Sequence, residues 1–145
     1  MPSPHRIIVI EDNPADTQLL RHALDEQGEK YVLEVLTDGE SALRFVRSQC
    51  QVHRPEPCLI VLDLHLPRED GITVLRAIRS EPELARVQVV VLTSMASPAE
   101  MAEVIALGVE SCRTKPINWP GTVELARELI AICNQSPARI AAQPA

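Results

Sequence analysis

The stretch Cys58-Leu-Ile-Val-Leu-Asp63-Leu-His-Leu-Pro-Arg-Glu-Asp-Gly71 decides the fold of this chain. Residues 59–62 form a short continuous apolar run, which is typical of a parallel strand buried on both faces. The run ends in the carboxylate of Asp63, and turn-forming residues follow up to Gly71. Helical spacing of apolar residues resumes at Ile72, so the stretch predicts a strand, a loop and a helix, with Asp63 at the carboxyl end of the strand.

The same order recurs along the rest of the chain. Apolar runs at 6–10, 31–36 and 87–92, and the short segment 111–114, each precede a segment with helical signals. Such alternation indicates an α/β protein with a parallel sheet and helices on both faces. Glu34 and Arg113 interrupt two of the runs, which favours edge positions for those strands. We therefore predict a flavodoxin-like, doubly wound, five-stranded parallel sheet in the order 2-1-3-4-5.

Capping residues and helix breakers predict the limits of the helices and of the domain. We expect Asp38 and Ser97 to cap the second and fourth helices. Residues 118–121 are predicted to be a loop, with Thr122 capping the fifth helix. Residues 1–134 are expected to form one domain and residues 135–145 a flexible tail, so we expect no output domain.

Composition excludes several function classes. A chain of 145 residues fits one domain with a core of its own. A net charge of −6, with one Trp, one Tyr and one Phe, argues against nucleic-acid and anionic-membrane partners. No apolar run approaches the ~18 residues of a membrane span, and the N-terminus lacks the apolar region of a signal peptide. We expect a soluble, cytoplasmic protein.

The four cysteines, Cys50, Cys58, Cys112 and Cys133, show no close CxxC spacing. Three of them lie in or beside apolar segments. We therefore expect reduced, buried thiols.

The predicted strand order brings carboxylates together. The first and third strands become neighbours, so Glu11, Asp12 and Asp63 are expected to converge at the switch point between them. Three carboxylates in one crevice repel each other unless a positive charge compensates. Mg²⁺ favours carboxylate oxygens, water and phosphate, whereas structural Zn²⁺ calls for His or Cys at a spacing that the four histidines lack. The pattern therefore predicts a Mg²⁺ site.

Phosphoryl transfer to a carboxylate fits this arrangement. A bound cation would keep Asp63 ionised, which makes Asp63 a candidate nucleophile. Thr93 and Lys115 end the next two strands and supply a hydroxyl donor and an ammonium for the phosphoryl oxygens. Each of these residues alone could be a turn former, a cap or a surface charge. Their conjunction on one edge of a sheet favours phosphoryl chemistry.

These motifs resemble the receiver domains of two-component response regulators. The resemblance covers residues 6–133, nearly the whole chain. The region from Glu11 to Asp16 and the Leu-Pro-Arg sequence at 66–68 are similar to single-domain regulators that partner phytochrome-type sensor kinases. The matching pieces are Val9-Ile-Glu-Asp-Asn-Pro14, Val61-Leu-Asp-Leu-His-Leu-Pro67 with Asp70-Gly71, Val91-Leu-Thr93-Ser94, and Lys115-Pro116.

The resemblance implies a role for each acidic position. Asp63 would accept a phosphoryl group from the phosphohistidine of a sensor histidine kinase. Asp12 would bind Mg²⁺ directly, Glu11 would assist through water, and the backbone carbonyl of His65 would complete the protein ligands. Such a protein would catalyse only its own phosphorylation and dephosphorylation.

The resemblance also implies a switch. Thr93 would contact the phosphoryl group and move on activation, and Lys115 would pair with it. The peptide bond before Pro116 is cis in many relatives. Met95, like His65, occupies a position that tunes phosphate lifetime, and its apolar side chain would shield the acyl phosphate from water.

Cys112 departs from the family pattern, because relatives usually have Tyr or Phe at this position. A cysteine lacks the large ring that swings inward when the threonine moves. The coupling therefore runs through Met95, Met101 or the fourth helix as a unit, or the switch is weak.

Three hypotheses follow for the function. In the first, a stand-alone regulator signals through a surface of the fourth helix, fifth strand and fifth helix, where Met101, Val104, Arg113 and Trp119 are expected to be exposed and where relatives form homodimers. In the second, the protein is a phosphorelay intermediate or phosphate sink. In the third it is an aspartyl-nucleophile phosphatase, although such enzymes carry a second Asp where this chain has His65.

Overall fold

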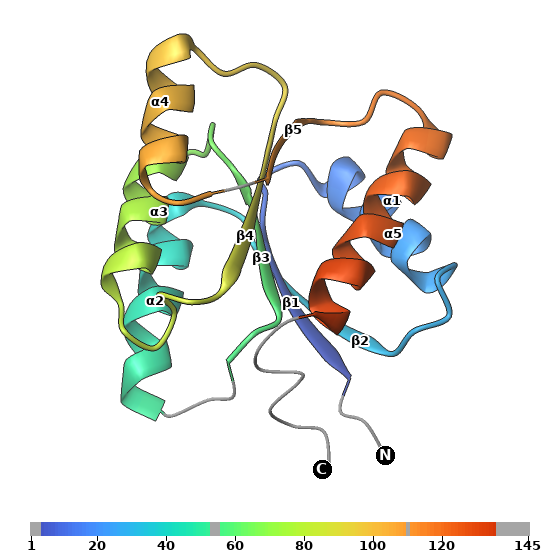
Figure 1. Ribbon diagram of the computed structural model, residues 1–145, viewed down its shortest axis with the longest axis horizontal. Coiled ribbons are helices and arrows are strands. Elements are labelled where there is room, and N and C mark those ends of the chain that lie inside the picture. The colour runs from blue at the N-terminus through green and yellow to red at the C-terminus, as the bar shows by residue number, and fades with distance from the viewer. Residues whose placement is uncertain (1–3, 53–55, 110, 136–145) are drawn as a thin grey trace.

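Parallel strands form a single sheet that is covered by helices on both faces (Figure 1). The structure is a computed structural model that describes residues 4–52, 56–109 and 111–135. The strands of these residues are β1 (His5–Ile10), β2 (Tyr31–Leu36), β3 (Leu59–Asp63), β4 (Gln88–Thr93) and β5 (Ser111–Thr114). They lie in the order β2-β1-β3-β4-β5, which confirms the predicted doubly wound α/β fold.

Helices alternate with the strands along the chain. They are α1 (Pro14–Asp25), α2 (Gly39–Val52), α3 (Gly71–Ser80), α4 (Pro98–Ala106) and α5 (Trp119–Asn134). Figure 1 shows α1 and α5 on one face of the sheet and α2, α3 and α4 on the other. Every connection between neighbouring parallel strands therefore passes through a helix, as parallel pairing requires.

Alternate residues of the central strands form two separate cores. In β1, Ile8 and Ile10 belong to the core beneath α2, α3 and α4, whereas Ile7 and Val9 belong to the core beneath α1 and α5. Side chains of β3 and β4 alternate in the same way. The continuous apolar runs of the sequence are thus buried on both faces, because side chains of a strand point alternately to opposite sides.

Both charged residues within the predicted edge strands have ion-pair partners. In β2, the Glu34 carboxylate Oε2 lies 3.0 Å from Nη2 of Arg6 in the neighbouring strand β1. In β5, Arg113 forms an ion pair with Glu128 of α5. An edge strand allows such side chains to reach solvent. The two charged residues therefore predicted correctly that β2 and β5 are the edge strands.

Ser97 and Asp38 act as helix caps, as the sequence predicts. The Ser97 hydroxyl accepts a hydrogen bond from the backbone N–H of Glu100, whose carboxylate accepts one from the Ser97 N–H. This reciprocal pair is a capping box. The Asp38 carboxylate accepts from the N–H of Ser41 at 2.7 Å.

The predicted loop at 118–121 is wrong, because α5 already begins at Trp119. The side chain of Asn118 is the N-cap and accepts a hydrogen bond from the Gly121 N–H at 2.8 Å. Thr122 lies inside the helix, where its hydroxyl donates to the Asn118 carbonyl. Pro120 and Gly121 suggested a break, yet the first helical turn tolerates proline because its N–H groups have no helical acceptor.

One residue of the predicted interaction surface is buried. Val104 of α4 is fully buried in the core, whereas its neighbour Ile105 is 66% exposed. The helix therefore presents a face shifted by one residue from the predicted one. Met101 is partly buried, and Arg113 and Trp119 are exposed as predicted.

Some predictions concern residues outside the described ranges. These are most of the tail, residues 136–145, and the side chain of Cys50. Of the remaining cysteines, Cys58 and Cys133 are buried and Cys112 is partly buried. Within the described ranges, no helix has the length and apolar character needed to cross a membrane.

Replacing Asn118 with Ala tests the corrected start of α5. Loss of the cap leaves the Gly121 N–H without its acceptor, so we expect the free energy of unfolding to fall by about 1 kcal/mol in urea titrations. Asn118→Asp keeps the acceptor oxygen and should unfold close to the wild type. An Asn118→Ala variant as stable as the wild type would contradict this assignment of the cap.

Candidate functional site

The register of the sheet sets the carboxylates side by side. Ile10 of β1 pairs with Leu62 of β3, so the residues that follow them, Glu11 and Asp63, lie at the same level. Oxygens of Glu11, Asp12 and Asp63 lie within 4.8 Å of one another. The three carboxylates therefore meet as the strand order predicts. They lie at the switch point of the sheet, where β1 has β2 on one side and β3 on the other.

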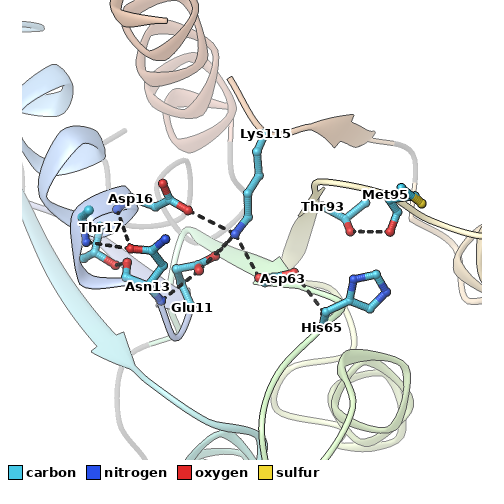
Figure 2. Close-up of polar contacts among 10 residues, drawn as sticks. Glu11, Asn13, Asp16, Thr17, Asp63, His65, Thr93, Met95 and Lys115 are labelled. Atoms are coloured by element: carbon cyan, nitrogen blue, oxygen red, sulfur yellow. Dashed lines mark hydrogen bonds and ion pairs between the residues drawn. The ribbon is translucent and has the colours of Figure 1, made fainter. Parts of the chain in front are cut away.

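The ammonium group of Lys115 lies between the carboxylates of Glu11 and Asp63 (Figure 2). Its Nζ atom is 2.8 Å from Oε2 of Glu11 and 3.0 Å from Oδ2 of Asp63. Lys115 follows β5, and its backbone N–H donates to the carbonyl of Thr93 at the end of β4. The ends of β1, β3, β4 and β5 thus contribute to one site.

Asp16 of α1 also contacts the lysine and was missed in the sequence. Its Oδ2 lies 3.2 Å from Nζ of Lys115 (Figure 2). The signal was present, because Asn13 caps α1 and Asp16 stands in the first turn of that helix. A carboxylate in this turn is close to the end of the preceding strand.

Backbone N–H groups hold the two buried carboxylates in place. The N–H of Asn13 donates to Oε1 of Glu11, and the N–H of His65 donates to Oδ1 of Asp63, both at 3.0 Å. In each case the donor lies two residues after the acid, as in an Asx-type turn. Lys115 contacts the second oxygen of Asp63 and both oxygens of Glu11. These contacts fix the orientation of Asp63 before any substrate binds.

Burial and charge act against each other at this site. Desolvation raises the pKa of Glu11, the hydrogen bond from Lys115 opposes the rise, and the charge of Asp63 adds to it. Desolvation lowers the pKa of Lys115, but its hydrogen bonds to Glu11 and Asp63 raise this pKa above its ordinary range overall. Lys115 is therefore a permanent cation at neutral pH. Glu11, Asp12, Asp16 and Asp63 leave an excess of carboxylates over this one ammonium.

Gly71 makes the loop after β3 possible. Its N–H donates to the Leu64 carbonyl at 2.8 Å, and a Cβ at this position would lie 2.5 Å from the carbonyl oxygen of Asp63. No side chain fits at that distance. Asp70 then caps α3 through the Thr73 N–H. The strand, loop and helix expected from the opening stretch are therefore held together directly behind Asp63.

Thr93 lies at the same edge, but its hydroxyl is directed elsewhere. The Oγ1 atom donates to the backbone carbonyl of Met95 at 3.0 Å (Figure 2). The Met95 side chain itself is 77% exposed. Thr93 therefore has to exchange this hydrogen bond for any contact with a group bound at Asp63.

The His65 side chain reaches α4. Its Nε2 lies 3.1 Å from Oε2 of Glu100, while its backbone N–H holds Asp63. Glu100 was not anticipated as a neighbour of the site. It completes the cap with Ser97, so the loop beside Asp63 contacts the start of α4 directly.

Cys112, at the position of the usual aromatic residue, also contacts α4. Its thiol donates to the Met101 sulfur at 3.5 Å. The Lys115–Pro116 bond, cis in many relatives, is trans in this structure. The trans form is the more stable one for an X-Pro bond by about 0.5–1 kcal/mol.

The fold and site define a class of protein. A parallel sheet in the order 2-1-3-4-5, with clustered acids and a lysine at its carboxyl edge, is the architecture of solved response-regulator receiver domains. A family model described as "Response regulator receiver domain" matches residues 7–127. The chain belongs to this family of two-component signalling proteins.

Named relatives agree with this assignment. The chain is 36% identical over 116 residues to the response regulator Rcp1 of Synechocystis sp., covering 79% of each chain. The crystal structure of the Mn²⁺-bound form of Rcp1 superposes with a TM-score of 0.77 at 32% identity, covering 88% of this chain and 93% of that one. The phosphorylated cyanobacterial phytochrome response regulator RcpA also gives a TM-score of 0.77, at 30% identity, with coverage of 88% and 91%.

The donor set fits a divalent cation. Hard oxygen ligands from Glu11, Asp12 and Asp63 suit such an ion, and Asp12 is exposed, so water can complete the coordination. The excess negative charge described above favours a dication over further monovalent partners.

A divalent cation bound at this site would compete with Lys115 for the Glu11 and Asp63 carboxylates. We therefore expect Lys115→Met to bind Mg²⁺ about tenfold more tightly, since about 1.4 kcal/mol of charge repulsion is enough for that change. Asp12→Asn should bind about tenfold more weakly, because it loses a charged ligand.

Isothermal titration calorimetry measures both changes in affinity. Asp25→Asn, at the far end of α1, is the matched control and should leave the Mg²⁺ affinity unchanged. If the wild type and all three variants bound Mg²⁺ with equal affinity, the cation would not bind at these carboxylates.

Proposed function

We propose that this protein accepts a phosphoryl group from a cytoplasmic sensor histidine kinase on Asp63 and signals by changing a protein-binding surface. One observation carries the proposal. The Asp63 carboxylate is buried at the end of β3, with one oxygen on the His65 N–H and the other on the Lys115 ammonium. Glu11 and Asp12 stand beside it.

The transfer moves a phosphoryl group from nitrogen to oxygen. An oxygen of Asp63 attacks phosphorus, the N–P bond of the kinase phosphohistidine breaks, and its electron pair remains on the imidazole. The products are an acyl phosphate on Asp63 and the free histidine. Because the His65 N–H holds Oδ1, Oδ2 is the oxygen that forms the new bond once Lys115 has moved from it to the phosphoryl oxygens.

Mg²⁺ would be held by Asp12, Asp63, the backbone carbonyl of His65 and, through water, Glu11. When bound, it supplies positive charge that neutralises the phosphoryl oxygens and orients the group for in-line attack. The residues of the chain meet this need, since their carboxylates cluster within 4.8 Å. The catalysis proposed is confined to the protein's own phosphorylation and dephosphorylation.

The phosphoryl group would change contacts at two places. Lys115 turns from Glu11 and Asp63 toward the new oxygens. The Thr93 hydroxyl leaves the Met95 carbonyl and donates to the phosphoryl group, which releases the loop before α4. With Cys112 in place of an aromatic residue, α4 would respond through the bond from Cys112 to Met101 and through the bond from His65 to Glu100.

A phytochrome-type kinase is the proposed phosphoryl donor. Support comes from relatives only, since RcpA, which matches 88% of this chain, is a cyanobacterial phytochrome response regulator.

The experiment is phosphorylation by a small phosphodonor with Mg²⁺, followed by mapping of the acid-labile adduct. Wild type should gain one phosphoryl group on Asp63, and Asp63→Asn should lose more than about 90% of the label, because an amide oxygen is a far weaker nucleophile. Asp25→Asn, an exposed aspartate of α1, is the matched control and should label like wild type. Undiminished label in Asp63→Asn refutes the proposal.

We further propose that the activated form dimerises through the surface around β5. Large exposed apolar side chains occur on the segments next to this edge strand in the chain, namely Met95 after β4, Ile105 in α4 and Ile117 after β5. Ile117 is 95% exposed. Contiguous exposed apolar side chains mark protein-binding surfaces. In a C2 dimer, the same patch of each subunit forms the interface.

Gel filtration with Mg²⁺ and beryllofluoride, a phosphoryl mimic, tests the dimer. The wild type is expected to double its apparent mass when the mimic binds. Ile117→Asp should remain monomeric, because a charge in the interface raises the cost of desolvation. Leu19→Asp, which alters an exposed apolar residue of α1, should dimerise like wild type. Unchanged mass of the wild type with bound mimic rules the dimer out.

A further inference from the structure

A second cluster of metal-ligand side chains lies at the opposite rim of the sheet from Asp63. It consists of His5 at the start of β1, Cys58 immediately before β3, and Cys133 in the last turn of α5. The start of β1 and the end of α5 lie near each other in Figure 1. No cysteine spacing in the sequence indicated this cluster, because the three residues come from segments that only the fold brings together.

The three side chains are close and buried. Their ligand atoms lie within 4.8 Å of one another, and Nδ1 of His5 is 3.9 Å from Sγ of Cys58. His5 and Cys133 have no exposed surface, and Cys58 is 6% exposed. A tetrahedral zinc site with Zn–S of ~2.3 Å and Zn–N of ~2.0–2.1 Å has ligand atoms about 3.6–3.8 Å apart. Rotations that move the three atoms together by about 1 Å or less would therefore form such a site.

The imidazole of His5 is oriented as in a histidine metal ligand. Its Nδ1 faces the thiol of Cys58, while its Nε2 is buried and makes no hydrogen bond. The Glu29 carboxylate lies 3.5 Å from Nε2. A metal on Nδ1 would place the proton on Nε2, directed at Glu29, which is the carboxylate–histidine–metal arrangement that orients ligand histidines.

The state of the Cys58 thiol suits metal binding. The thiol of Cys133 as hydrogen-bond donor and the contact with His5 lower the pKa of Cys58 to about 5, against the opposing effect of burial. Metals bind the thiolate form of cysteine. Binding of a metal by both cysteines releases their thiol protons to solvent.

We propose that His5, Cys58 and Cys133 bind a zinc ion. Charge selects the metal, because Zn²⁺ with two thiolates and a neutral imidazole forms a complex without net charge, which a buried site tolerates. A monovalent thiophilic ion would leave one negative charge buried, and Mg²⁺ disfavours sulfur ligands. Three protein ligands leave the fourth tetrahedral position to a water molecule.

Such a site would fasten the end of α5 to the sheet. His5 is the first residue of β1 and pairs with Tyr31 of β2, Cys58 immediately precedes β3, and Cys133 is one residue from the end of α5. A ligand that binds only the folded state adds stability by mass action. Zinc would therefore stabilise the packing of α5 independently of the phospho-acceptor at the other rim.

Cobalt titration of the reduced, metal-free full chain tests the proposal, because thiolate-bound Co²⁺ has an intense near-ultraviolet charge-transfer band that carboxylate ligands do not give. We expect this band to saturate at one equivalent and to vanish when Zn²⁺ displaces Co²⁺. Cys58→Ser and Cys133→Ala should lose the band. Cys112→Ser, which removes a thiol outside the cluster, and Asp12→Asn, at the phospho-acceptor site, should both keep it.

The Glu29→Gln variant keeps all three ligands, so it still tests the site if the cysteine variants fail to fold. It should bind Zn²⁺ about 10–100-fold more weakly while its circular dichroism spectrum is unchanged. A wild type without the thiolate band, a band that persists in folded Cys58→Ser, or unaltered zinc affinity in Glu29→Gln would overturn the proposal. Phosphorylation of Asp63 is measured separately, so neither result depends on the other.

Discussion

The structure depends on the placement of one ammonium group among buried carboxylates. The parallel register of β1 and β3 sets Glu11 and Asp63 at the same level. Lys115 follows β5, the edge strand beside β4, and its ammonium group reaches both carboxylates. Without that charge, two acids that are each less than a tenth exposed would face each other across neighbouring strands. The excess of negative charge that remains suits a dication.

Most of the fold was predictable because its determinants are local. Continuous apolar runs identified the buried strands, Glu34 and Arg113 identified the edges, and Ser97 and Asp38 identified helix starts. The start of α5 was mispredicted because Pro120 and Gly121 are breakers in most contexts and acceptable in a first turn. The exposed face of α4 was missed by one position, since only packing decides that Val104 is inside.

The site was predictable in its residues and not in its contacts. Strand ends give Glu11, Asp63, Thr93 and Lys115 directly, but they do not show that the Thr93 hydroxyl is bonded to the Met95 carbonyl. Asp16 and the cluster of His5, Cys58 and Cys133 depend on side chains that converge from separate segments. The two rims of the sheet therefore differ in chemistry, with hard oxygen ligands at the carboxyl ends of the strands and sulfur and imidazole ligands at the amino ends.

The central claim is that Lys115 exchanges its carboxylate partners for a phosphoryl group on Asp63. A crystal structure of the protein with Mg²⁺ and beryllofluoride tests it most directly. We expect beryllium on an oxygen of Asp63, Lys115 Nζ within hydrogen-bond distance of a fluoride, and the Thr93 hydroxyl released from the Met95 carbonyl. Beryllofluoride on another carboxylate, or Lys115 still bound only to Glu11 and Asp63 with the mimic in place, would contradict it.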